Sequence, residues 1–153
     1  KVGAGTIYRY FESKEALVNA VYQREKQGLL DAVLKDFPVA SPPRAQWRAL
    51  FRGVVVFGKE NPLAFEFLES HHHAPYLDPT SRALEERVMQ LAQAFLDSTR
   101  ASQVTRDCPS MVLVALVWGG VVRFVRSGHE GLLALDEDTI ERFESLCWEA
   151  LRA

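Results

Sequence analysis

Prolines and glycines at wide spacing divide this sequence into segments long enough for helices of three or more turns. Apolar residues recur within the segments at intervals of three and four, which is the period of a helix that packs one face on a core. No stretch of the sequence alternates apolar and polar residues as a half-buried strand does, and no repeat or low-complexity tract is present. The sequence therefore predicts an all-α fold.

The boundaries of the predicted helices follow from capping residues and prolines. Ser13 is a good N-cap for the first helix, and Asn61-Pro62 ends one helix and begins the next. The third helix is expected to end at Ala74-Pro75. The helices are expected over residues 14 to about 37, from the Ser-Pro-Pro at 41–43 to Asn61, 62–74, 78–101, 111–125 and 136–152.

Charge, cysteine content and hydropathy limit the class of protein. The net charge of -2 gives no global attraction to nucleic acid, so any basic surface must be local. Cys108 and Cys147 have no CxxC or metal-ligand spacing, which favours reduced thiols in a cytoplasmic protein. The longest apolar stretch, Met111 to Val125, is shorter than the roughly 20 residues that a membrane-spanning helix needs, and it contains Arg123. We therefore expect a cytoplasmic protein without a membrane span.

Aromatic and basic residues cluster near the start of the chain, in GTIYRYFESKEAL at residues 5–17. A buried face does not need Arg and Lys between its aromatic residues, whereas a surface that binds a polyanion does. The glycines ahead of the cluster allow a close backbone approach, and the free N–H groups of a helix start favour an anion. The hydroxyls of Thr6, Tyr8 and Tyr10 can donate to phosphate oxygens, and Lys14 adds a positive charge.

This cluster resembles the second half of the helix-turn-helix in the TetR family of bacterial transcriptional regulators. The family pattern is a small residue, Gly-Thr, an aliphatic residue, Tyr, a variable or basic residue, an aromatic residue or His, Phe, then Ser or Asn, Lys and an acidic or small residue. Residues 5–11 and 13–15 fit it position by position. The two helices that normally come first are absent from the sequence shown. The resemblance implies DNA binding, with Arg9 as the best candidate to contact base edges. The predicted DNA-binding residues are Ala4, Gly5, Thr6, Tyr8, Arg9, Tyr10 and Lys14.

The resemblance also implies how the chain is organised and what it does. Residues 1–14 would form the C-terminal half of the helix-turn-helix domain, 15–36 a connecting helix, and 37–153 a helical ligand-binding and dimerisation bundle. The protein is then expected to be a homodimeric repressor that a small-molecule effector releases from operator DNA. No enzymatic activity and no cofactor are expected.

The middle helices carry more aromatic residues than packing requires. Although a single aromatic at helical spacing is usually a core residue, a cavity between helices with aromatic walls and a few polar groups is the usual form of a small-molecule site. The effector pockets of the family lie in this region, and Arg123 is a further candidate for a polar wall group. The predicted effector-binding residues are Trp47, Phe51, Phe65, Leu68, Glu69, His72, Phe95 and Trp118.

Two C-terminal helices are candidates for a dimer interface. The apolar helix from Met111 to Val125 and the last helix cannot both be covered by so small a chain, and Gly119-Gly120 permits a close helix approach. We expect a four-helix interface, which matches an operator of two-fold symmetry. The predicted interface residues are Leu116, Gly119, Gly120, Phe124, Phe143, Cys147 and Leu151.

Three consecutive histidines, His71 to His73, keep an enzymatic alternative open. Glu69 with His72 or His73 could offer zinc two ligands on one helix face, and the metal could activate a water for hydrolysis. Successive residues point about 100° apart on a helix, so at most two of the histidines can converge. We expect no metal site, and a metal-dependent hydrolytic enzyme or a helical interaction module remain the alternatives.

Overall fold

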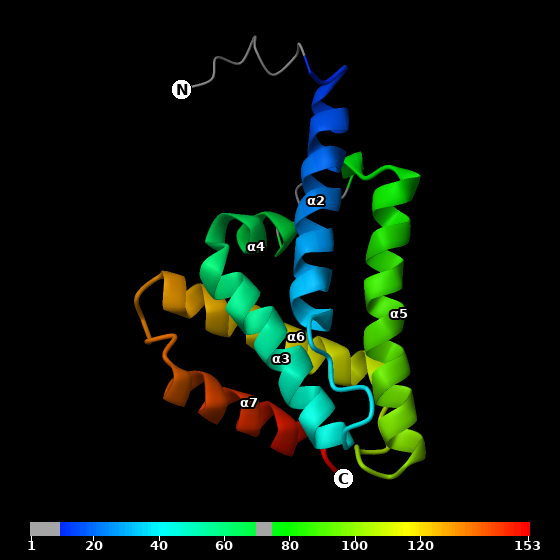
Figure 1. The fold of residues 1–153 in the computed structure, drawn as a ribbon, viewed down its shortest axis with the longest axis vertical. Helices are drawn as coiled ribbons and strands as arrows, with labels where there is room; N and C mark the ends of the chain where they lie inside the picture. The colour runs from blue at the N-terminus through cyan, green and yellow to red at the C-terminus, as the bar shows by residue number, and fades with distance from the viewer. Residues whose placement is uncertain (1–9, 70–74) are drawn as a thin grey trace.

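The computed structural model describes residues 10–69 and 75–153 of the chain. Within these ranges the regular structure is helical, with one isolated bridge between Thr105 and Arg152 and no strand. The expectation of an all-α fold is confirmed. The helices in Figure 1 are α2 (Lys14–Leu34), α3 (Pro43–Glu60), α4 (Pro62–Glu69), α5 (Pro79–Ala101), α6 (Ser110–His129) and α7 (Glu137–Leu151).

Side-chain caps start three of the helices. Ser13, Asp78 and Asp136 each accept a hydrogen bond from the backbone amide three residues later, at 3.0, 2.7 and 2.8 Å. Each bond satisfies one of the amides that the start of a helix leaves unpaired. The end of α2 was predicted less well, because the helix stops at Leu34 and not near residue 37. Asp36 adopts a left-handed φ of 55°, which a right-handed helix cannot continue.

The helices form a bundle around α3, which contacts α2, α4, α6 and α7. Figure 1 shows α2 and α5 side by side along the long axis, with α6 crossing behind them. The start of α2 extends beyond the other helices, so its N-terminal end is free of the bundle on most sides.

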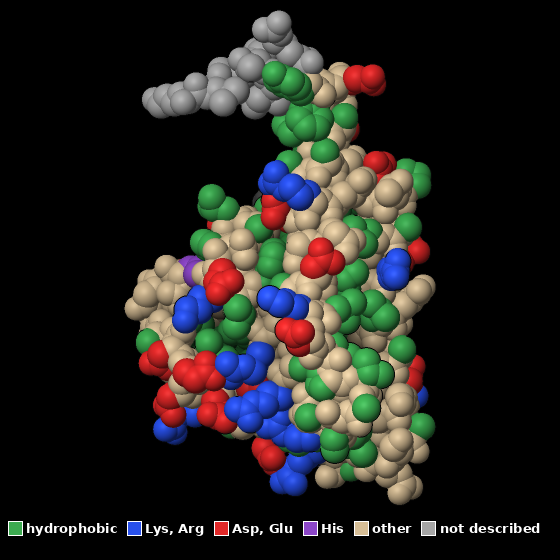
Figure 2. All heavy atoms as spheres, in the orientation of Figure 1, with side chains coloured by type: hydrophobic (Ala, Val, Ile, Leu, Met, Phe, Trp, Pro, Cys, Tyr) green, Lys and Arg blue, Asp and Glu red, His purple; other side chains and the backbone are tan. Residues whose placement is uncertain are grey.

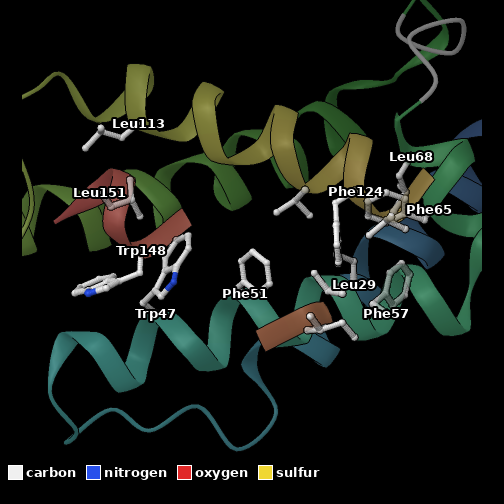
Figure 3. Packing of buried hydrophobic residues seen from close by; sticks show 14 of the residues in the cluster. Leu29, Trp47, Phe51, Phe57, Phe65, Leu68, Leu113, Phe124, Trp148 and Leu151 are labelled. Atoms are coloured by element: carbon white, nitrogen blue, oxygen red, sulfur yellow. The ribbon is translucent and has the colours of Figure 1, made fainter. Parts of the chain in front are cut away.

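Aromatic rings connect α3 with α6 and α7 in the core (Figure 3). The ring of Phe51 lies 5.8 Å from those of Trp47 and Phe143, and Phe143 stacks on Phe124 at 4.3 Å. Trp47 also lies 6.2 Å from Trp148 of α7. Because each such pair adds about 0.5–1.5 kcal/mol beyond its burial, this chain of rings is a main link between the three helices.

α2 and α3 meet in backbone contact at Gly53. A Cβ on this residue would lie 2.7 Å from Val33 Cα and 3.1 Å from the carbonyl oxygen of Ala32. No side chain fits into that space, so a glycine is required there. The contact fixes the C-terminal half of α2 to α3.

An antiparallel ladder of ion pairs joins α3 and α7. The pairs are Arg44 with Glu144, Arg48 with Glu141, and Arg52 with Glu137. The hydrogen bond between the last two groups raises the pKa of the Arg52 guanidinium and lowers the pKa of the Glu137 carboxyl. Because successive arginines are one helical turn apart, the ladder sets the register of α7 along α3.

α6 is longer than the apolar stretch from which it was predicted. It has 20 residues, so by length and composition alone it could cross a membrane, and the shorter apolar stretch Met111 to Val125 does not by itself exclude this. A helix that is apolar on several sides is also typical of a bundle core. One side of α6 packs against α3, α4 and α5 with Leu113, Val121 and Val125 buried. Another side leaves Val112 and Leu116 exposed.

Candidate functional site

An apolar cavity of about 190 Å³ lies between α2, α3, α5 and α6. Its walls are leucine, valine, alanine, phenylalanine and tryptophan side chains, with Leu151 of α7 at one end. None of these groups is charged. The C-terminal half of α2 forms one wall, through residues such as Leu29 and Val33, and the middle of α5 forms the facing wall, through residues such as Val88 and Ala92.

Four of the predicted effector residues line this cavity. Trp47 and Phe51 come from α3, Phe95 from α5 and Trp118 from α6. The aliphatic walls from α2 and α5 were not predicted. Helical periodicity identifies residues that face inward, but it cannot tell which of them border a void rather than another side chain.

The other predicted effector residues lie elsewhere. Phe65 and Leu68 are buried at the opposite end of the core from Trp47 and do not line the cavity (Figure 3). Glu69 accepts a hydrogen bond from Trp118 Nε1 at 3.0 Å, and His72 lies outside the described residues.

Arg123 does not supply the polar wall group that the sequence suggested. Its side chain is exposed and pairs with Glu130 at 3.2 Å. It borders an open groove between α6 and α7 and not the cavity. The lining residues therefore leave the cavity without a charge of either sign.

The cavity opens to solvent between α2 and α5. Leu34 and Leu91 both line it, yet 44% and 45% of their surfaces are exposed. Figure 2 shows hydrophobic side chains gathered on this face along α5 and beside the C-terminal end of α2. These two leucines therefore mark a path by which a small molecule can enter.

Trp47, one of the residues that line the cavity, has a polar atom without a hydrogen-bond partner in the described part of the chain. The indole nitrogen of Trp47 is buried and makes no hydrogen bond within residues 10–69 and 75–153, and only 7% of the residue is exposed. Figure 3 shows its ring between those of Trp148 and Phe51. A buried donor without an acceptor lowers the stability of the fold by about 1–3 kcal/mol, and such donors are uncommon in folded proteins.

Asn19 fixes the N-terminal half of α2 to the start of α5. Its Nδ2 donates to the Tyr76 carbonyl at 2.8 Å. Its Oδ1 accepts from the Asp78 amide at 2.8 Å and from Ser81 Oγ at 2.7 Å. The Lys14 ammonium lies 5.3 Å from the centre of the Tyr76 ring, a cation–π distance. These contacts hold the beginning of α2 against the segment that leads into α5.

A second polar contact between α2 and α5 lies two turns from the start of α5. The Tyr22 hydroxyl donates to Glu85, and Lys26, which is almost fully buried, pairs with the same carboxylate. Burial raises the pKa of Tyr22, and the hydrogen bond to Glu85 raises it further. α2 is thus bound to α5 in its first half and to α3 in its second half.

Most of the predicted DNA-binding residues lie outside the described part of the chain, namely Ala4, Gly5, Thr6, Tyr8 and Arg9. Tyr10 and Lys14 are described, and both are exposed. They lie at the end of α2 that extends beyond the bundle (Figure 1). Their position is accessible to a large partner.

Of the predicted interface residues, Leu116 and Gly119 are exposed on α6. A Cβ on Gly119 would have no other group within 4 Å, whereas a Cβ on Gly120 would lie 3.3 Å from the Phe143 ring. Gly120 therefore allows α6 to pack closely against Phe143 of α7 within the same chain. Gly119 leaves an open surface that another helix could approach.

The remaining interface predictions fall on more buried positions. Phe143 and Cys147 are partly buried, and burial raises the pKa of the Cys147 thiol to about 11. Phe124 and Leu151 pack inside the chain, so they offer almost no surface to a second copy. The sequence reasoning missed Met111, Val112 and Leu146, which are exposed apolar residues of α6 and α7. They could have been recognised in the sequence as apolar residues on the side of each helix opposite the apolar residues that face the core.

The histidine cluster that suggested zinc, His71 to His73, is outside the described residues. In the rest of the chain, at residues 10–69 and 75–153, no group of three His, Cys, Asp or Glu side chains is placed to hold a metal ion.

Comparison with known proteins gives the family. Residues 22–153 match the family described as "Tetracyclin repressor-like, C-terminal domain", and residues 1–21 match "Bacterial regulatory proteins, tetR family". An "Uncharacterized HTH-type transcriptional regulator" of Haemophilus influenzae is 31% identical over 74 residues, which are 48% of this chain and 40% of that protein. The match thus spans about two fifths of the length of this curated relative.

Solved structures share the fold at low identity. A TetR family transcription regulator from Marinobacter aquaeolei VT8 has a TM-score of 0.82 and 23% identity, covering 97% of this chain and 78% of that one. A TetR-family regulator from Haemophilus influenzae RD has a TM-score of 0.70 and 20% identity, covering 99% and 80%. The family match over residues 22–153 shows that the chain belongs to the TetR family of bacterial regulatory proteins.

Proposed function

We propose that this protein is a ligand-responsive transcriptional regulator, a cytoplasmic repressor that a small apolar effector releases from operator DNA. The observation that carries the proposal is that one helix reaches both sites. The N-terminal end of α2 follows the DNA-binding motif, and its C-terminal half forms a wall of the cavity. Membership in a family of regulatory proteins favours this function over the hydrolytic enzyme.

The contacts of α2 suggest how an effector acts on DNA binding. Gly53 fixes the second half of α2 to α3, and Asn19 fixes its first half to α5. An effector that separates α5 from α3 must therefore tilt α2 between them. In a dimer, a small tilt changes the spacing of the two DNA-binding segments, which must match about 34 Å, one turn of DNA. The resulting misfit weakens phosphate contacts in both half-sites.

The proposed dimer forms through α6 and α7. The support is the exposed apolar surface of Met111, Val112, Leu116 and Leu146, together with the open backbone at Gly119. A face of this kind on two neighbouring helices suits a two-fold interface in which the same residues meet from both copies.

Leu116→Glu should weaken dimerisation by about a hundredfold or more, because two carboxylates would lose water at the centre of the proposed interface. Sedimentation at micromolar concentration should show a dimer for the natural protein and a monomer for the variant. Leu132→Glu is the matched control. Leu132 is also well exposed, but it lies in the loop that connects α6 to α7 and not on either helix. A monomeric natural protein, or a variant that stays dimeric, would contradict this interface.

Lys14→Ala in the full-length protein should weaken binding to all DNA sequences. The slope of log K against log salt concentration should become shallower by about 0.9 for each phosphate that the variant no longer neutralises, one phosphate per subunit. Lys35→Ala removes the same charge from the far end of α2 and should leave the slope unchanged. Arg9→Ala should in addition relax sequence preference. Equal slopes for the natural protein and Lys14→Ala would show that the ammonium makes no phosphate contact.

Selection of binding sites from random DNA by the full-length protein tests the function itself. We expect an enriched site of two-fold symmetry with half-sites one helical turn apart. A pool without an enriched sequence would contradict a role in transcription.

A further inference from the structure

We infer that Tyr76 is a positioning residue for DNA binding, whose ring orients the Lys14 ammonium toward a phosphate before DNA binds. This role rests on the proposed function, because it concerns the phosphate contact proposed for Lys14. It goes further by assigning a part in DNA binding to a residue far from the DNA-binding motif in sequence. Three features support it: the contact of the two side chains, the fixed backbone at Tyr76 and the exposure of Lys14.

The Lys14 ammonium lies over the ring of Tyr76. The distance from its nitrogen to the centre of the ring is 5.3 Å. A lysine within about 6 Å of an aromatic ring is attracted to the negative face of that ring. No carboxylate in the described part of the chain forms an ion pair with Lys14. The ring therefore orients the ammonium without neutralising it, and its charge stays available for a phosphate.

The backbone at Tyr76 is held to α2 by a different residue. Asn19, which is only 6% exposed, donates from Nδ2 to the Tyr76 carbonyl at 2.8 Å. Its Oδ1 accepts from the Asp78 amide at 2.8 Å, and the Asp78 carboxylate caps α5. The segment is thus bound to α2 on both sides of residue 77. The Tyr76 ring therefore projects from a backbone that is ordered without any help from Lys14.

Lys14 lies where a DNA duplex can reach it. It is exposed at the end of α2 that extends beyond the bundle, directly after the DNA-binding motif (Figure 1). An ammonium group has three N–H donors, and a ring on one side leaves those on the other side free. Lys14 can therefore donate to a phosphate oxygen while it stays on the Tyr76 ring.

A lysine that is ordered before binding gives a tighter complex. The stem of a free lysine samples many rotamers, and fixing it on a phosphate costs conformational entropy. The Tyr76 ring restricts the stem in the unbound protein, so less entropy is lost when DNA binds. The ring carries no charge, so it does not alter the number of phosphates that are neutralised. Loss of the ring should therefore lower affinity without changing the salt dependence.

Tyr76→Leu and Tyr76→Phe test this role in the full-length protein, alone and combined with Lys14→Ala. Phenylalanine keeps the aromatic face, whereas leucine keeps an apolar side chain without it. The probe is duplex DNA of mixed sequence, because a phosphate contact does not require the operator. Fluorescence anisotropy at a series of salt concentrations gives the affinity and its salt slope. Thermal unfolding shows whether each variant is folded.

Tyr76→Leu should weaken DNA binding about threefold per subunit, and so about tenfold for a dimer, with an unchanged salt slope. Tyr76→Phe should stay within about twofold of the natural protein. In the Lys14→Ala background, Tyr76→Leu should have no further effect. An equal loss in both backgrounds, an equal loss in Tyr76→Phe, or no loss in Tyr76→Leu would each overturn the role. Selection of a symmetric site from random DNA by the natural protein would show that the proposed function stands in all three cases.

A second measurement needs neither DNA nor a folded Tyr76→Leu variant. In the natural protein with isotope-labelled lysine, the ε-protons of Lys14 should resonate upfield of those of Lys35, which is exposed at the other end of α2. The reason is that protons over the face of an aromatic ring are shielded by it. Loss of the signal in Lys14→Arg assigns it, and Tyr76→Phe should keep the shift. Lys14 protons at the same position as those of Lys35 would contradict the contact.

Discussion

Arg44→Met should lower the free energy of unfolding by about 3 kcal/mol, which is the largest effect that we expect from a single substitution outside the cavity. Glu144 is only 1% exposed, and Arg44 binds its carboxylate through two nitrogens, one of them at 2.8 Å. Methionine keeps the stem that packs near Trp148 but leaves the carboxylate buried without a partner. The value is at the lower end of the range for buried pairs because Arg44 is partly exposed.

Urea denaturation can separate lost charge pairing from lost packing. Arg48→Met in the same ladder should cost less than about 1 kcal/mol, because Glu141 is half exposed and regains water. Adding Glu144→Met to Arg44→Met should recover most of the loss, since no buried charge remains. If Arg48→Met lowered the free energy of unfolding as much as Arg44→Met, the burial of Glu144 would not explain the loss in Arg44→Met.

Gly53→Ala should lower the free energy of unfolding by about 2 kcal/mol and reduce operator affinity. The new methyl group would lie 2.7 Å from Val33 Cα, a backbone atom that cannot turn away, so α2 and α3 must separate. Since the proposed DNA-binding residues lie at the start of α2, the separation should also change the direction in which they point. Thermal unfolding and titration of operator DNA by the full-length variant measure the two effects.

Gly28→Ala is the matched control on α2. A Cβ there would lie 3.6 Å from Phe57 Cε2, an ordinary contact, and alanine favours a helix by about 0.5–1 kcal/mol over glycine. This variant should be as stable as the natural protein or more so, with unchanged operator affinity. Equal losses in both variants would mean that the close approach at Gly53 is not what fixes α2.

The order and the beginnings of the helices could be predicted because their signals are local. Ser13, Asp78 and Asp136 cap helices through bonds that span only three residues. The end of α2 depends on the left-handed conformation of Asp36, for which periodicity gives no signal. The same limit applies to Gly53, since nothing near it in sequence indicates that Val33 lies against it.

The candidate site could be predicted only in part, for a similar reason. Aromatic composition pointed to Trp47 and Phe51 in the cavity, but equally to Phe65, which packs at the other end of the core. The apolar side of α6 pointed to Leu116 on the surface and equally to Phe124, which is buried. The position of a residue on a helix indicates whether it faces the core or the solvent. The location of the cavity and of the exposed apolar face of α6 depends instead on how several helices pack together.

The central claim is that the cavity and the DNA-binding segment act on each other through α2. The most direct test is the affinity of an effector, found by thermal-shift screening, for the full-length protein with and without saturating operator DNA. Linkage requires that an effector which lowers operator affinity binds the operator complex more weakly by the same factor, typically about 5- to 150-fold. We predict that the effector lowers operator affinity and that operator DNA lowers effector affinity by the same factor, and that this factor is well above one. Equal effector affinities with and without operator would contradict it.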